Sequence, residues 1–160
     1  MTEDDYLSEI GRLVRERGDV GADAVLLADA AVTAHPSSVR LWCRRGDLIQ
    51  LGPEETPHTL EDARASYERA LQLDPDSADA LESLGHYFDA VEPDESLAES
   101  YLARSIERGA SRAAFVSLAA LYLETGRRHE ALSLLSPERC PYADDPEVSV
   151  VCDEIAGQER

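Results

Sequence analysis

Lysine and asparagine are absent from this 160-residue chain, so all 15 of its basic residues are arginines. Against them stand 33 aspartates and glutamates, which give a formal net charge of −18 at pH 7. Such a charge repels the phosphate backbone of nucleic acids and anionic membrane surfaces before contact forms. We therefore expect no nucleic-acid partner and no membrane partner.

Cysteines and long apolar runs are also scarce. Cys43, Cys140 and Cys152 are an odd number without a CxxC spacing, which suits a reducing compartment and offers no zinc site. The N-terminus begins with acids rather than with the basic and apolar segments of a secretory signal. No apolar stretch reaches the roughly 20 residues of a membrane span. These absences predict a cytoplasmic protein with no metal and no cofactor.

Short helical segments account for most of the chain. Glycine and proline interrupt apolar patterns of helical period, and the strict alternation typical of strands is missing. Thr2, Asp76 and Asp94 are suitable N-caps for three of the segments. Nine helices joined by short links predict an all-α fold.

A two-helix pattern recurs four times along the chain. The first helix of each copy carries a small residue after two large or long ones, as in Trp42, Arg45 and Gly46. Successive small residues are 35, 39 and 34 positions apart, and a PEETPH insert explains the longer middle spacing. Four phased copies favour a repeat architecture over an ordinary helical bundle, which is the alternative all-α fold. The small residues are Gly11, Gly46, Gly85 and Ala119.

This pattern resembles the tetratricopeptide repeat (TPR), a helix-turn-helix unit of about 34 residues. The resemblance covers residues 7 to about 136 and departs from the family at Arg45, where the family has leucine. It implies a single domain over 1–160, built as an α-solenoid of about four TPR-like repeats in which the small residues let the second helix cross close to the first. The repeats are expected at about 3–36, 37–75, 76–110 and 111–137.

A further helix is expected over about 146–156, after the last repeat. Val148, Val151 and Ile155 form an apolar stripe on it. We expect this helix to cap the solenoid, since a terminal repeat needs its apolar face covered. Folding back into the groove and exchange with a second subunit are the alternatives.

The residues offer no recognisable catalytic site. No phosphate-binding loop, HExxH motif or EF-hand spacing occurs, and no nucleophile motif lies near a histidine. Two of the histidines, His58 in the insert and His129, are expected to be solvated. We therefore predict that the protein is not an enzyme, although a pocket holding His86 with Glu82 and Asp89 would revive that possibility.

The TPR resemblance implies an adaptor or scaffold that binds a peptide or helix of a partner protein in a concave groove. In this family the inner stripe of the first helices follows the second, fifth, ninth and twelfth repeat positions. Here it changes from arginine-bearing, with Asp5, Ser8, Arg12 and Arg15 in the first repeat, to acidic and then apolar. We predict that the arginines hold an acidic group of the partner and that the apolar end seats an anchor. The candidate peptide-binding residues are Arg12, Arg15, Arg40, Arg44, His86, Val116 and Leu123.

Two alternatives stay open at this point. Arg12 has Glu9 and Glu16 at helical spacing, and Arg44 has Asp47, so the spacing favours ion pairs of these arginines along their own helices over partner binding. The protein could also be a structural or self-assembling subunit that uses exposed repeat faces for oligomerisation. Of the neighbouring residues, Trp42 is expected in the core and Cys43 on the inner stripe as an unreactive small residue.

Overall fold

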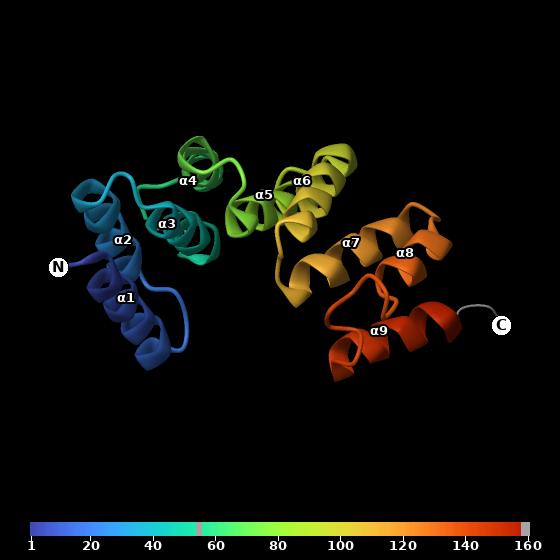
Figure 1. Cartoon of the computed structure of the whole chain (residues 1–160). Helices are drawn as coiled ribbons and strands as arrows, with labels where there is room; N and C mark the ends of the chain where they lie inside the picture. The colour runs from blue at the N-terminus through green and yellow to red at the C-terminus, as the bar shows by residue number, and fades with distance from the viewer. Residues whose placement is uncertain (54–55, 158–160) are drawn as a thin grey trace. The chain divides into compact units, whose positions relative to one another are not determined.

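The computed structural model describes residues 1–53 and 56–157, so Glu54 and Glu55 of the PEETPH insert lie outside the described residues. Within those two ranges the regular structure is entirely helical, with no strand (Figure 1), which confirms the all-α prediction. The described residues form nine helices, which are α1 (Glu3–Arg17), α2 (Ala22–Ala34), α3 (Val39–Leu51), α4 (Leu60–Leu73), α5 (Ala78–Ala90), α6 (Glu95–Glu107), α7 (Arg112–Glu124), α8 (Arg128–Leu134) and α9 (Pro146–Gly157). No described helix is both long enough and apolar enough to cross a membrane.

Side-chain caps fix where several helices begin. The Thr2 hydroxyl accepts a hydrogen bond from the Asp5 backbone N–H, and Asp94 caps α6 in the same way, as predicted. The predicted cap of α5 was wrong by one residue, because the Ser77 hydroxyl, rather than Asp76, accepts the Ala80 backbone N–H at 3.3 Å.

The chain divides into two compact units, Met1–Leu84 and Gly85–Arg160, with the boundary inside α5. Each unit contains its own fully buried apolar side chains, such as Leu41 and Leu81 in the first and Leu102 and Leu118 in the second. The single domain and its repeat boundaries remain predictions.

In the first unit, α3 packs against both α2 and α4. Trp42 is half-buried on α3 and packs against the apolar clusters on either side of that helix. Its indole N–H donates to the Pro36 carbonyl oxygen at 3.0 Å. Trp42 therefore serves the core, as predicted, and its polar edge is satisfied at the link before α3.

Two of the predicted small residues lie where a second helix crosses closely. A Cβ on Gly46 would overlap the buried ring of Tyr67 on α4, with the ring Cζ at 2.7 Å. A Cβ on Gly85 would lie 2.6 Å from Leu102 Cγ on α6. Because real Cβ atoms do not approach other atoms this closely, both positions require glycine for the helices to pack.

The same prediction is wrong for Gly11. A Cβ there would meet only the Arg15 guanidinium, with Nη1 at 3.2 Å, and no atom of α2. Arg15 belongs to the same helix and its end is flexible, so the contact sets no helix-crossing distance. Gly11, Gly46 and Gly85 occupy equivalent positions of the sequence pattern. A close approach of the second helix explains the glycine at Gly46 and Gly85 but not at Gly11.

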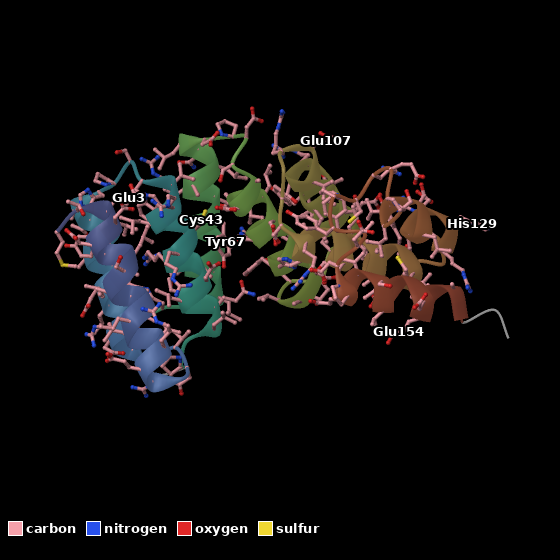
Figure 2. The ribbon with its side chains drawn as sticks, turned by 60° about the horizontal axis from the view of Figure 1, so that its bottom comes forward. Glu3, Cys43, Tyr67, Glu107, His129 and Glu154 are labelled. Atoms are coloured by element: carbon pink, nitrogen blue, oxygen red, sulfur yellow. The ribbon has the colours of Figure 1, made fainter. Side chains whose placement is uncertain are left out.

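In the second unit, α9 packs against both α7 and α8, as expected for a capping helix (Figure 1). Val148 and Ile155 are buried, whereas Glu154 points away from the hairpin (Figure 2). Polar contacts hold both ends of α9: Arg112 pairs with Asp145 just before the helix, and Arg128 donates to the carbonyl oxygen of residue 156 near its end. The distances are 2.9 and 2.8 Å.

Candidate protein-binding surface

An open depression of about 770 Å³ lies over α1 and α2 in the first unit. All four residues of the first predicted inner stripe line it, together with Asp23 and Leu27 of α2. The helical period of α1 brings the stripe to one face, and the crossing of α2 supplies the opposite wall. The complete lining is Met1, Asp5, Ser8, Glu9, Arg12, Leu13, Arg15, Asp23 and Leu27.

Arg12 is paired with acids of its own helix. Its guanidinium donates to both carboxylate oxygens of Glu9 and to Glu16, which confirms the ion pairs expected from the helical spacing. The hydrogen bonds that Arg12 donates to Glu9 and Glu16 raise the pKa of Arg12, so it is a permanent cation. These side chains are largely exposed, and the pairs therefore organise the surface more than they stabilise the fold.

The other predicted arginines lie in different surroundings. Arg40 is exposed at the start of α3 and pairs with Glu3 and Asp4 of α1 at 3.2 and 3.0 Å. Arg44 is half-buried on α3. Arg15 is exposed, and among the ion pairs of the described residues none involves it. The depression therefore brings together Arg12 and Arg15, and it does not include Arg40 or Arg44.

The next part of the predicted stripe is acidic and partly buried. The hydroxyl of Tyr67 lies within hydrogen-bond distance of Asp47 Oδ1 and Gln50 Oε1, at 3.1 and 3.2 Å. Burial raises the pKa of Asp47, and the charge of Asp79 adds to this, while the Tyr67 hydrogen bond and the charge of Arg44 oppose it. The predicted Arg44–Asp47 attraction is thus present as an electrostatic effect.

Cys43 lies on α3 and packs in a buried cluster with Ala70 of α4 and Ala80 of α5. It is 7% exposed, and burial, with added repulsion from Asp47 and Asp79, raises the pKa of its thiol to about 12. A thiol that stays protonated is a poor nucleophile. Cys43 is therefore chemically passive, as expected from its sequence context.

This raised pKa predicts a pH dependence of stability. The unfolded thiol ionises near pH 9, whereas the folded thiol does not, so the contribution of Cys43 is complete below that pH and is lost as the pH rises toward 12. We expect the unfolding free energy of the wild type, relative to Cys43→Ala, to fall by at most about 1.4 kcal/mol per pH unit in this window. Urea unfolding under reducing conditions from pH 8 to 10.5 measures the difference, and parallel curves for the two proteins would contradict it.

The candidate residues of the second unit lie on α5 and α7. His86 is half-buried on α5. Val116 and Leu123 are half-buried on α7, and Ala113 and Ala120, at the other positions of the same stripe, are exposed. This stripe of α7 is apolar, which suits the predicted anchor for an apolar side chain.

A polar cluster on the first unit was missed by the sequence analysis. Arg45 Nε donates to Asp29 Oδ1 at 2.7 Å, and its Nη1 donates to the buried Ser66 hydroxyl at 2.6 Å. His58 Nε2 lies 2.7 Å from Asp29 Oδ2. We call Asp29, Arg45, His58 and Ser66 the arginine cluster. It joins α2, α3 and α4 to His58, two residues before α4.

The arginine cluster corrects the prediction that His58 is solvated, because its side chain is only 14% exposed. It also explains why Arg45 replaces the family's leucine: the side chain reaches partners on two other helices. Two signals in the sequence could have indicated it, namely a charged residue at a core position and a histidine in an unusually long turn. Neither signal identifies Asp29 as the shared partner.

In the part of the chain that the structure describes, His35, His58 and His129 form no catalytic constellation with a nucleophile. Ser66 is completely buried and bonded to Arg45, so no substrate can reach it. His35 lies against the Tyr6 ring and the carbonyl oxygen of Met1, and His129 is exposed. Within residues 1–53 and 56–157, no group of three or more histidine, cysteine or acidic side chains could hold a metal ion.

Comparison with known proteins agrees with this fold. Residues 59–90, which span α4 and α5, match the family model described as TPR repeat. Two crystal structures of MamA are similar at 22% sequence identity. One has a TM-score of 0.63 and covers 97% of this chain and 86% of that chain, and the other has 0.61, 92% and 88%. No curated protein matches the chain.

The resemblance to the TPR family and the predicted fold class are thereby confirmed. The chain has the all-α solenoid fold of TPR-like hairpins with a C-terminal capping helix, and its segment 59–90 is a TPR repeat. Proteins built from TPR repeats are in general protein–protein interaction modules.

Proposed function

We propose that the protein is a non-enzymatic adaptor that binds a peptide or helix of a partner protein on the inner faces of its hairpins. The observation that carries the proposal is the depression over α1 and α2. The four residues of the first predicted inner stripe, Asp5, Ser8, Arg12 and Arg15, all line it. The depression is open and mixed in charge, as expected for a surface that binds a chain segment rather than a small molecule.

Within this site Arg15 is the proposed anchor for a carboxylate of the partner. Arg12 and Arg40 already hold acids of this chain and would exchange one carboxylate for another with little net gain. Arg15 has an exposed guanidinium and can form a new bidentate contact. Arg44 in the first unit, and His86, Val116 and Leu123 in the second, lie outside the depression and stay candidate contacts of their own units.

Site-specific cross-linking tests this proposal. A photoreactive amino acid at Ser8, inside the depression, is expected to capture one defined partner in the native cell, whereas the same group at the exposed Ala65 of α4 is not. Arg15→Glu should lower the yield at Ser8 by about tenfold, the loss expected for a charge-assisted contact. The matched reversal Arg139→Glu, on an exposed arginine of the second unit, should leave it unchanged.

Two results would overturn the proposal: equal capture at Ser8 and Ala65, or an unchanged yield with Arg15→Glu. Capture of a second copy of this chain at Ser8 would instead support the self-assembling alternative, which light scattering at two protein concentrations would verify. We also propose the cytoplasm as the location, in keeping with the free thiols of Cys43, Cys140 and Cys152.

A further inference from the structure

Three charged groups from three helices surround the imidazole of His58. Its Nε2 lies 2.7 Å from Oδ2 of Asp29 on α2. Its Nδ1 lies 3.4 Å from Nη2 of Arg45 on α3 and 3.9 Å from Oδ2 of Asp62 on α4. The carboxylates of Asp29 and Asp62 favour a proton on the ring nitrogen that faces them, whereas the Arg45 guanidinium favours an unprotonated Nδ1.

The observed geometry fits a neutral imidazole. The short contact with Asp29 requires a proton on Nε2, because a carboxylate only accepts. A guanidinium only donates, so Nδ1 must carry a lone pair to accept from Arg45. In this form the hydrogen bonds around Asp29, Arg45 and His58 are complementary, and the charges of Asp29 and Arg45 balance.

A solvent proton bound at Nδ1 changes that arrangement. The ring would then present an N–H and a positive charge to Arg45, which has no lone pair to receive the proton. Asp62 Oδ2, 3.9 Å from Nδ1, is an acceptor on that side of the ring. This oxygen already accepts from the backbone N–H and the hydroxyl of Thr59, at 2.8 and 3.1 Å, in the capping box of α4.

We propose that His58 is a proton-operated switch whose Nδ1 accepts from Arg45 when the ring is neutral and donates to Asp62 when it is protonated. The switch couples pH to the Arg45 link between α2, α3 and α4 and to the N-terminal cap of α4. The Thr59 hydrogen bonds hold the pKa of Asp62 below its usual range, so Asp62 is an acceptor at pH 5 as well as at pH 8.

Nuclear magnetic resonance of the ¹⁵N-labelled full chain tests the first state. At pH 8, long-range spectra should show His58 as the tautomer protonated at Nε2, whereas the exposed His129 should show a mixture. His58→Gln assigns the signal, and its amide can still donate to Asp29. A His58 tautomer protonated at Nδ1 would overturn the proposal without requiring any variant to fold.

The second state is tested at pH 5. Rotation of the Arg45 guanidinium about its Cζ–Nη2 bond should become several-fold faster than at pH 8, and the Asp62 carboxyl ¹³C signal should shift in step with the His58 ring. Neither change should occur in His58→Gln, and both should persist in His129→Gln.

Two groups in the same sample serve as controls. Arg127, held by Glu99 and Glu130 in the second unit, should keep its rotation rate, and the Glu61 carboxyl should not follow the His58 ring. An Arg45 response that persists in His58→Gln, or no response in the wild type, would refute the switch.

Discussion

Asp29→Ala is expected to lower the free energy of unfolding by about 1–3 kcal/mol, the cost of leaving the partners of a partly buried carboxylate without their acceptor. The substitution leaves the Arg45 guanidinium, whose side chain is 14% exposed, without its carboxylate, and it leaves His58 Nε2 without an acceptor. Urea unfolding followed by circular dichroism at pH 7.5 measures the loss.

A second substitution separates this explanation from a simple packing defect. Arg45→Leu restores the family's apolar residue, and replacing a buried ion pair with apolar side chains is often neutral or stabilising. The double variant Asp29→Ala/Arg45→Leu should therefore be more stable than Asp29→Ala alone by at least about 1 kcal/mol. Additive losses from the two changes would show that the pair is not coupled.

Gly46→Ala is expected to destabilise the protein by about 1–3 kcal/mol, because the new methyl group overlaps the buried Tyr67 ring. Tyr67 is held by α3 and α4 and has a hydrogen-bonded hydroxyl, so it cannot move without breaking other contacts. Gly11→Ala is the matched control. It should stabilise by about 0.5–1 kcal/mol, since alanine is the better helix former and only the end of Arg15 must shift.

Thermal unfolding of the two variants provides the measurement. Opposite shifts of the melting temperature are expected, downward for Gly46→Ala and upward for Gly11→Ala. Equal losses at both positions would contradict the distinction drawn from the packing, because they would mean that α2 lies as close to Gly11 as α4 lies to Gly46.

The helices and their repeat could be predicted because they depend on local signals. A helix is indicated by the period of its apolar residues and by the residues at its two ends. Thr2 and Asp94 cap the starts of their helices, and Gly18 ends α1. The regular spacing of Gly46 and Gly85 then identified the hairpins in which a close crossing is required. Gly11 shares the spacing but not the crossing, since packing in the first copy depends on which side chains α2 brings to it.

The ion pairs within one helix were equally predictable, as Arg12 with Glu9 and Glu16 shows. The arginine cluster was not, because Asp29, Arg45 and His58 come from three segments whose approach depends on the tertiary fold. The pKa of Cys43 could not be predicted either, since the acids beside it include Asp79 from another helix. Sequence spacing therefore predicted the helices and the ion pairs within one helix. It did not predict contacts between residues of different helices, such as those of the arginine cluster.

The arginine cluster limits how modular this array of repeats can be. In an ideal solenoid, one hairpin can be exchanged for a consensus copy because its neighbours present standard surfaces. Here Asp29 belongs to the preceding hairpin, while Arg45, His58 and Ser66 belong to the next one. Replacing the second hairpin with a consensus copy would leave the Asp29 carboxylate without its partners. The two hairpins must therefore be exchanged or redesigned together.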